Sequence, residues 1–244
     1  MERQRPYLFG VLAGLFLAAG LVLSAMFLGR TWLKIKDGQS VSVTGSARKA
    51  VLSDLIVWKG SFAVEATTLL AAQKQLKDDL AKVEAFLRDK GVTNYSVGTI
   101  AIQERRSSLL RDGESFDRLA GFRLTQTVEI RSPEVERIAR LDRETVALVE
   151  QGVVFTTEAP KFIYSKAGEA KVEMLAEATK DARARADQIA VQGGRAVRQL
   201  SDARMGVFQI TPVHSSLSSW DGMNDTSSLE KTITAVVTAT FSLE

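Results

Sequence analysis

The chain has 244 residues with 32 Lys/Arg, 29 Asp/Glu, one His and no Cys, which gives a formal net charge of +3. The positive excess belongs to residues 1–37, which hold five Lys/Arg and two Asp/Glu, so residues 38–244 hold 27 of each sign. A neutral domain lacks the field that attracts phosphate backbones, so we expect no nucleic-acid partner. The absence of cysteine excludes a thiol nucleophile and disulfides, and it leaves the compartment open.

A long uncharged run, Tyr7 to Gly29, opens the chain. At about 1.5 Å per residue, a helix over this run crosses a hydrocarbon core of about 30 Å. A cleavable signal has an apolar region of roughly 7 to 15 residues that ends in small residues, whereas Leu23-Ser24-Ala25 begins with a bulky one. Tyr7 and Trp32 flank the run as interfacial aromatics do. We therefore predict that residues 7–29 are a retained anchor in the lipid bilayer, within an N-terminal segment 1–37.

The orientation of this anchor does not follow from charge. Arg3 and Arg5 precede the run, and Arg30, Lys34 and Lys36 follow it, so the positive-inside count favours neither side.

Residues 38–244 are long enough for one domain or for two halves with a real core. Residues 41–47 alternate as a strand, and residues 52–65 place Leu52, Ile56, Trp58, Phe62 and Val64 on one face of another. Residues 48–51 then predict a hairpin connection. Residues 67–90 carry a helical stripe that Gly91 ends as the left-handed residue. The stripe comprises Leu69, Ala72, Leu76, Leu80, Val83 and Leu87.

The middle of the chain predicts two more strands, 94–104 and 120–131, joined by a charged loop, 105–119, whose tip is Arg111-Asp112-Gly113-Glu114. Ser132-Pro133 predicts the start of a helix that ends at Gly152, and residues 153–164 predict a strand.

The last third predicts the longest helix, capped by Ser165 and ended by Gly193-Gly194. Its stripe comprises Val172, Leu175, Thr179, Ala182, Ala186, Ile189 and Ala190, of which the small Ala182 and Ala186 permit close packing on a sheet. Residues 197–210 predict a strand interrupted near Gly206, residues 211–228 a polar loop, and residues 232–243 a strand with Ile233, Ala235, Val237, Ala239, Phe241 and Leu243 inward. The predicted class is α+β, a mixed and largely antiparallel sheet with about three packed helices.

No catalytic residue, cofactor site or metal site is predicted. His214, the only histidine, lies in a Pro-Val-His-Ser-Ser stretch without a nucleophile-elbow pattern, so we interpret it as a loop residue. One histidine and no cysteine exclude a zinc cluster. Asp221, Asn224 and Asp225 resemble the start of a calcium loop but lack the downstream Glu, so turn chemistry explains them better.

Other candidates have structural interpretations as well. Gly193-Gly194 follows a helix and cannot cradle phosphate, and Asp78-Asp79 is predicted on the solvent side of its helix beside Lys74 and Lys82. Arg105-Arg106 is interpreted as part of a solvated loop. Asp54 lies on the apolar parity of its strand, so its carboxylate must be satisfied by backbone donors or a cation or remain in water at the strand's end, and we interpret it as a turn or strand-start anchor.

Several segments together resemble the SIMPL domain over nearly all of residues 38–244. They are Val41 to Ala47 with Ser53-Asp54, Gly121-Phe122-Arg123 leading to Gln126 to Ile130, the Ala-rich helix from Ala178 to Gly194, and Asp225 to Lys231. The resemblance implies an exported α+β domain facing the periplasm or cell exterior, with the N-terminus of the anchor inside. It also implies homo-oligomeric rings or channel-like assemblies, suggested roles in envelope stress tolerance or signalling, and no transferable catalytic residue.

The sequence therefore predicts a noncatalytic, membrane-anchored envelope protein that self-associates, with strands 52–65 and 232–243 pairing between copies through open edges. The alternative is a solute-binding or signalling-adaptor module in which Trp58, Phe62 and Trp220 line an apolar pocket.

Overall fold

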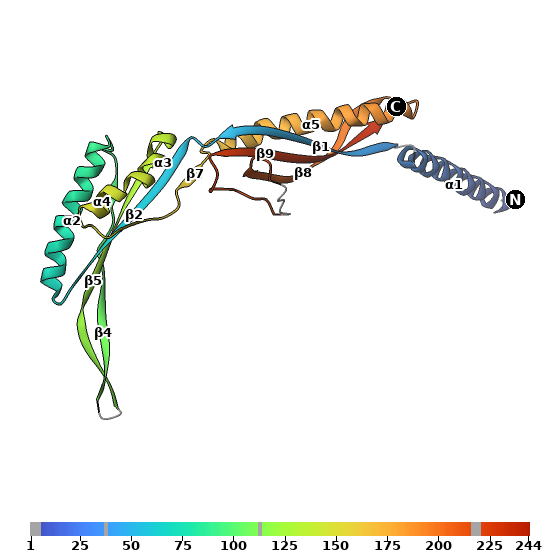
Figure 1. The fold of residues 1–244 in the computed structure, drawn as a ribbon. Helices are drawn as coiled ribbons and strands as arrows, with labels where there is room; N and C mark the ends of the chain where they lie inside the picture. Colours follow the sequence, from blue (N-terminus) through green and yellow to red (C-terminus); the bar gives the residue numbers. More distant parts are fainter. Residues whose placement is uncertain (1–5, 37–38, 112–113, 216–220) are drawn as a thin grey trace. The chain divides into compact units, whose positions relative to one another are not determined.

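The computed structural model describes residues 6–36, 39–111, 114–215 and 221–244 (Figure 1). The chain forms two compact units, which are defined by the contacts that residues make within each unit. The smaller unit comprises Met1–Ala47, Leu175–Gly206 and Val236–Glu244, and the larger one comprises Arg48–Met174 and Val207–Ala235. The α+β class is confirmed, but two sheets replace the single sheet that the sequence predicted.

The N-terminal helix α1 (Pro6–Lys36) is continuous. From Gly10 to Arg30 every residue is exposed, and none of this stretch is buried by the described part of the chain. In the described part of the chain it is the one helix long and apolar enough to cross a membrane, which is compatible with an anchor or with a signal sequence.

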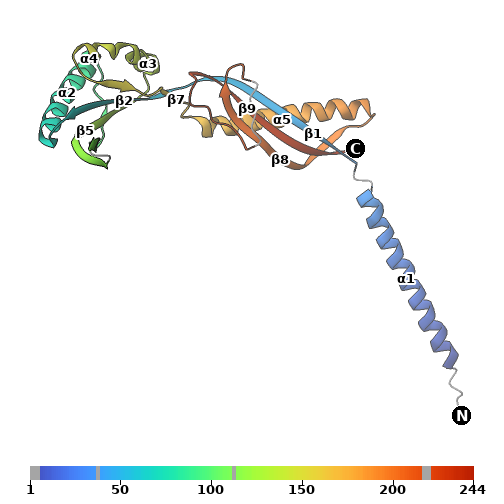
Figure 2. The same cartoon turned by 60° about the horizontal axis from the view of Figure 1, so that its bottom comes forward.

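The strand residues of the smaller unit belong to a three-stranded sheet in the order β1-β9-β8. Its strands are β1 (Ser40–Leu52), β9 (Glu230–Leu243) and β8 (Val197–Pro212). The helix α5 (Ala167–Gln192) packs along this sheet (Figure 2). The predicted inward positions of β9 from Ile233 to Phe241 are buried, which confirms the strand's alternation. The core of the smaller unit joins Val43, Val237, Ala239 and Phe241 to the helix residues Ala178, Ala182 and Ala186.

The spacing between α5 and β1 is set by small residues. A Cβ atom on Gly45 would lie 2.2 Å from the carbonyl oxygen of Ala178 and 2.4 Å from the amide nitrogen of Ala182, so only glycine fits there. Ala182 and Ala186 are fully buried, which confirms the predicted close packing. The rest of the predicted stripe is partly wrong, because Val172 and Ile189 are exposed and the buried face steps by four residues through alanines and Met174.

The larger unit has a six-stranded sheet whose centre is β2 (Leu55–Ala66), paired antiparallel along its length with β5 (Glu114–Ser132). The short strands β6 (Phe155–Thr157) and β7 (Lys161–Ile163) pair with the other side of β2. On the far side of β5 lie β3 (Ser96–Val97) and β4 (Ala101–Arg111).

Three helices cover this sheet: α2 (Leu69–Asp89), α3 (Val135–Glu144) and α4 (Val146–Glu150). The fully buried Ile56, Trp58 and Phe62 of β2 form the centre of the core, and Trp58 stacks on Phe155 of β6 at 6.1 Å. The helix α2 confirms the prediction for 67–90, and Gly91 after it has a φ of 71°, as predicted.

The predicted hairpin at 48–51 is wrong. Strand β1 continues to Leu52, and it belongs to a different sheet from β2. The break falls instead at Ser53-Asp54, because residues 48–51 contain no turn-forming glycine, proline or asparagine. The same break changes the side-chain parity, so Leu52 is 63% exposed and does not share the buried face of β2.

The predicted loop 105–119 is wrong as well. Strands β4 and β5 run to Arg111 and from Glu114, and these two residues are partners, so the position of the hairpin tip is confirmed. Residues 112 and 113 lie outside the described residues. The predicted strand 94–104 is split at Gly98, whose amide donates to the carbonyl of Thr127 at 2.8 Å.

Three further predictions fail in detail. The predicted helix up to Gly152 divides at Thr145 into α3 and α4, and Pro160 divides the predicted strand 153–164 into β6 and β7. The predicted interruption of β8 at Gly206 is absent, since the strand is continuous. Glycine fits there because a Cβ atom would lie 3.1 to 3.3 Å from Val236.

The prediction that Asp79 lies on the solvent side of α2 is wrong. It is 3% exposed, because positions 76, 79 and 83 share one face of the helix, whereas Asp78 is exposed as predicted. The ammonium of Lys82 lies 3.1 Å from the Asp79 carboxylate and also donates to the carbonyl of Gln151.

The predicted open edges are also wrong. Strand β2 is paired on both sides, and β9 lies between β1 and β8. The unpaired edges belong instead to β1 and β8 in the smaller sheet. In the larger sheet they belong to β6 and β7 on one side and to β3, β4 and the part of β5 before Phe122 on the other.

Candidate functional site

Asp54 lies in the break between β1 and β2, where its carboxylate accepts two hydrogen bonds from Ser165. The amide nitrogen and the hydroxyl of Ser165 each donate at 2.7 Å to a different oxygen of Asp54. Burial alone would raise the pKa of Asp54, but the hydrogen bonds from Ser165, together with the backbone amide of Asp54 and the charge of Lys166, hold the pKa below its usual range. The predicted role as a strand-start anchor is confirmed.

The same contact corrects the predicted cap of α5. The Ser165 hydroxyl donates to Asp54, and the helix begins only at Ala167. Ser165 therefore joins the break at residues 53–54 to the start of α5.

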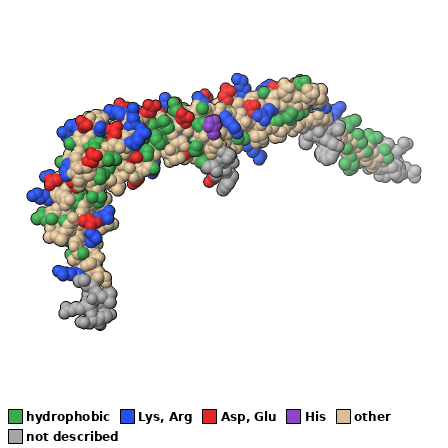
Figure 3. Space-filling model, in the orientation of Figure 1, with side chains coloured by type: hydrophobic (Ala, Val, Ile, Leu, Met, Phe, Trp, Pro, Cys, Tyr) green, Lys and Arg blue, Asp and Glu red, His purple; other side chains and the backbone are tan. Residues whose placement is uncertain are grey.

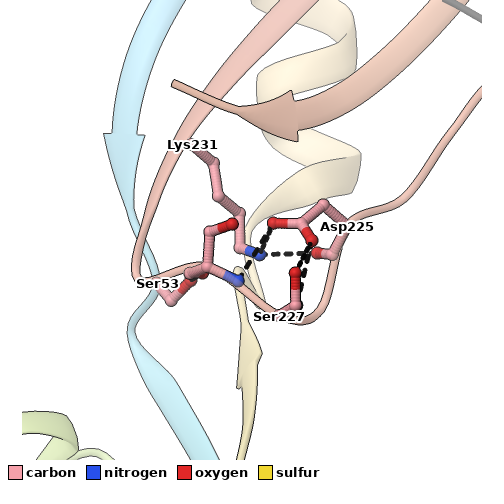
Figure 4. Close-up of polar contacts among 5 residues, drawn as sticks. Ser53, Asp225, Ser227 and Lys231 are labelled. Atoms are coloured by element: carbon pink, nitrogen blue, oxygen red, sulfur yellow. Dashed lines mark hydrogen bonds and ion pairs between the residues drawn. The ribbon is translucent and has the colours of Figure 1, made fainter. Parts of the chain in front are cut away.

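A second polar cluster lies beside this break and centres on Asp225 and Lys231 (Figure 4). The Lys231 side chain is fully buried, and its ammonium donates to the Asp225 carboxylate at 2.9 Å and to the Asp225 carbonyl at 2.5 Å. The other carboxylate oxygen accepts from the amide and hydroxyl of Ser227, as in an Asx-turn. Ser53 is tied to the same loop through the carbonyls of residues 228 and 229.

The electrostatics of this cluster favour the ionised acid. Burial opposes ionisation of Asp225, but hydrogen bonds from Ser227, Lys231 and Ser228 hold its pKa far below the usual carboxyl range. Because Asp225 binds donors of its own chain, we interpret the cluster as a clip that fixes residues 225–231 against the start of β2. We call it the Asp225–Lys231 clip.

The proposed calcium-loop residues are not brought together as a metal site. The backbone of Met223 to Asp225 pairs with Ile210, and Asp225 is occupied by the clip. In the ranges that the structure describes, no group of three His, Cys, Asp or Glu side chains is arranged to hold a metal ion.

His214 lies on the surface in the turn after β8, with a positive φ of 64° (Figure 3). This exposed turn position agrees with the predicted loop residue. Gly193-Gly194 ends α5 as predicted, since Gly194 has a φ of 68° and its amide donates to the carbonyl of Val191.

Trp58 and Phe62 do not line a pocket. Both are fully buried in the core of the larger unit, and the indole of Trp58 donates to Asp142 at 3.4 Å. Trp220 lies outside the described residues. The aromatic pocket on which the solute-binding alternative rests is therefore not formed by Trp58 and Phe62.

Arg105 and Arg106 lie on β4 and not in a loop. Arg105 forms an ion pair with Glu65, and Arg106 pairs with Glu104 at 3.1 Å. All four side chains are exposed, so these ion pairs contribute little to stability.

A groove of about 540 Å³ follows α2 beside the start of β4. Apolar side chains of Leu70, Leu80 and Ile100 line it, and Leu70 is 78% exposed. Apolar surface of this kind is typical of a contact with a partner molecule.

The described residues thus define an α+β chain behind one apolar helix, with polar clusters that hold its own segments together. The family profile described as "SIMPL: Protein of unknown function (DUF541)" matches residues 41–241. The chain therefore belongs to the SIMPL family, as the resemblance predicted. The match covers segments of both units and begins after α1. A search of curated proteins found no match.

The Asp225–Lys231 clip is what the sequence interpretation missed. Lys231 has the same parity as Ile233 and Ala235, the inward positions of β9, so its charge required a buried partner. That signal was available in the alternation of the last strand.

Proposed function

We propose that this chain is a noncatalytic envelope protein, held in the bacterial inner membrane by α1, whose extracytoplasmic part assembles with further copies of itself. The N-terminus lies inside, and the two units lie in the periplasm or outside the cell. A homo-oligomeric ring or channel-like assembly would serve envelope maintenance or stress tolerance. Membership of the SIMPL family and the apolar helix support this proposal.

The observation that carries self-assembly is the hairpin of β4 and β5. Strand β2 pairs with β5 only as far as Phe122, so residues 106–111 and 114–119 pair with each other alone. We call these residues the ribbon. Gly121, with a φ of 154°, and a register shift after Arg105 mark the point where the ribbon leaves the sheet.

A two-stranded ribbon is marginally stable in water, and its two edges offer unpaired backbone groups to another chain. The side chains of the ribbon whose burial is described, 106–108 and 117–119, are all exposed. Leu119 is 48% exposed, as is expected of a strand that a second copy covers. The apolar groove beside α2 adds surface that the same assembly would bury.

The mass of the full-length protein in mild detergent tests self-assembly. Size-exclusion chromatography with light scattering should give several protomers for the natural chain. A variant in which Asn-Gly replaces residues 106–120 joins the paired Arg105 and Gly121 by a two-residue turn and should give a smaller mass. Its melting temperature should change little, because the described ribbon side chains contribute nothing to the core.

The double variant Ser107→Ala, Ser108→Ala is the matched control. It keeps the backbone edges of the ribbon and should retain the natural mass. A monomeric natural chain would refute self-assembly, and an unchanged mass after removal of the ribbon would refute its role.

Orientation is tested with single cysteines, because the natural chain has none. A membrane-impermeant maleimide should label Glu177→Cys, an exposed position of α5 outside the ribbon, in intact spheroplasts. Labelling only after lysis would place the units in the cytoplasm and contradict the proposal.

The noncatalytic role is supported by where the candidate side chains lie. Asp54 is bound by Ser165, and His214 lies in an exposed turn. A hydrolytic activity of the purified chain that His214→Ala or Asp54→Asn abolished, with the melting temperature unchanged, would overturn it.

A further inference from the structure

We infer that one end of the smaller unit, formed by the turn between α5 and β8, binds the headgroups of anionic phospholipids in the membrane that holds α1. The inference rests on the proposed function, since it requires α1 to be a retained anchor. It adds a second contact between the protein and the lipid.

Two backbone hydrogen bonds bring three segments to this end. The amide of Leu243 donates to the carbonyl of Gln39 at 2.9 Å, and the amide of Glu244 donates to the carbonyl of Ala196 at 2.9 Å. The start of β1, the end of β9 and the start of β8 therefore meet, and Figure 2 shows the C-terminus beside the start of β1. The chain enters the smaller unit from α1 at this same end.

The length of chain between α1 and Gln39 keeps this end near the lipid. The apolar stretch Gly10–Arg30 is 21 residues long, about 31 Å as a helix, which matches the hydrocarbon core. The six further helical residues to Lys36 rise about 9 Å, close to the thickness of a headgroup layer. Gln39 is three residues after Lys36, so its Cα atom lies at most about 11 Å from that of Lys36, whatever the conformation of the chain between them. That distance is about one Debye length at physiological salt.

The charge and polarity of this end suit an anionic surface. Arg195 and Arg198 lie on either side of Ala196, and both are exposed. Arg198 is opposed only loosely by Glu244 at 3.8 Å, and in the described ranges Arg195 has no ion-pair partner. Val191, 65% exposed in the last turn of α5, adds an apolar side chain where arginine and apolar residues together favour the membrane interface.

Acidic lipid, and not a protein partner, is the occupant that these observations favour. The chain cannot move this end away from the bilayer, so the local lipid concentration is high and even two arginines suffice for a contact. Such a contact must weaken with salt and with loss of lipid charge.

The test uses the full-length protein in nanodiscs. Because the chain has no cysteine, Gln192→Cys provides a single site for a fluorescent donor at the end of α5, and the acceptor is placed on a minor headgroup. Energy transfer should be higher in discs of phosphatidylcholine with 30% phosphatidylglycerol, on the order of a typical anionic membrane, than in phosphatidylcholine alone. The difference should disappear at about 0.5 M salt.

The variant Arg195→Gln, Arg198→Gln should lose at least about half of this lipid-dependent difference. The control Arg183→Gln, Arg204→Gln removes the same charge from exposed positions away from the turn and should keep it. Equal transfer in both lipids, or equal loss in both variants, would overturn the inference. If the protein did not enter nanodiscs at all, the anchor itself, and with it the proposed function, would be wrong.

Discussion

Removing the acid of the Asp225–Lys231 clip should destabilise the protein strongly. The substitution Asp225→Ala leaves the Lys231 ammonium fully buried, with the carbonyl of residue 225 as its one remaining partner among the described contacts. Removing one partner of a buried ion pair costs about 3 to 5 kcal/mol, because an uncompensated charge stays in the interior. The substitution also deletes the acceptor for Ser227 and Ser228.

For a chain of this size, each kcal/mol lowers the melting temperature by about 2 to 4 °C, so we expect a decrease of about 6 to 20 °C. The decrease is measured by circular dichroism on the full-length protein in detergent. The matched control is Glu173→Ala, which breaks the exposed ion pair with Lys49 at 2.7 Å and should cost less than about 1 kcal/mol.

A third variant tests whether the loss of stability comes from the unpaired Lys231 charge or from the other hydrogen bonds of Asp225. Asp225→Ala, Lys231→Met removes both charges and should recover much of the loss, since an apolar side chain of similar length replaces the ammonium. If Asp225→Ala melted within about 2 °C of the natural chain, as the control should, the Asp225 carboxylate would not be needed to stabilise the buried Lys231 ammonium. That result would refute the role assigned to the clip.

Three further predictions concern pH and glycine positions. Because the folded-state pKa of Asp225 is lowered, its contribution to the free energy of unfolding is present above the ordinary carboxyl pKa of about 3.9 and is lost as pH falls below it. Denaturant titrations should therefore show a steeper loss of stability below pH 4 in the natural chain than in Asp225→Asn. Gly45→Val should cost at least about 2 kcal/mol, because its Cβ meets backbone atoms of α5 that cannot move away. Gly168→Ala should stabilise by about 0.5 kcal/mol, because no atom lies within 4 Å of the added methyl and alanine favours the helix.

Much of the fold follows from local periodicity. Strand β9 and helix α2 were predictable because one face of each is apolar with the period of its element, and Gly91 and Gly194 ended helices where left-handed residues were expected. The partition into two sheets was not predictable in this way. Alternation specifies which side chains of a strand are inward, but it does not specify the strand beside it.

The predictions at the break and at the ribbon failed for different physical reasons. Residues 48–51 carry no turn chemistry, yet two strands of different sheets had to be separated, and the separation depends on the distant contact of Asp54 with Ser165. Apart from Leu119, the ribbon side chains whose burial is described are polar, and all of them are exposed, so no apolar alternation identified the ribbon as strand. Asp79 and Lys231 are the opposite case, because they are charged side chains on buried faces. Each is held there by an ion-pair partner that periodicity does not identify.

The ribbon also affects how long an unassembled chain survives. Proteases bind their substrates as extended strands, and Arg106 and Arg118 offer basic cleavage positions on exposed strand backbone. In a compartment with trypsin-like enzymes, a copy whose ribbon is uncovered would be cut first, and under the proposed assembly a copy whose ribbon is paired would be spared. Under the proposed assembly, the ribbon would then set both how copies associate and how fast an unassembled copy is degraded.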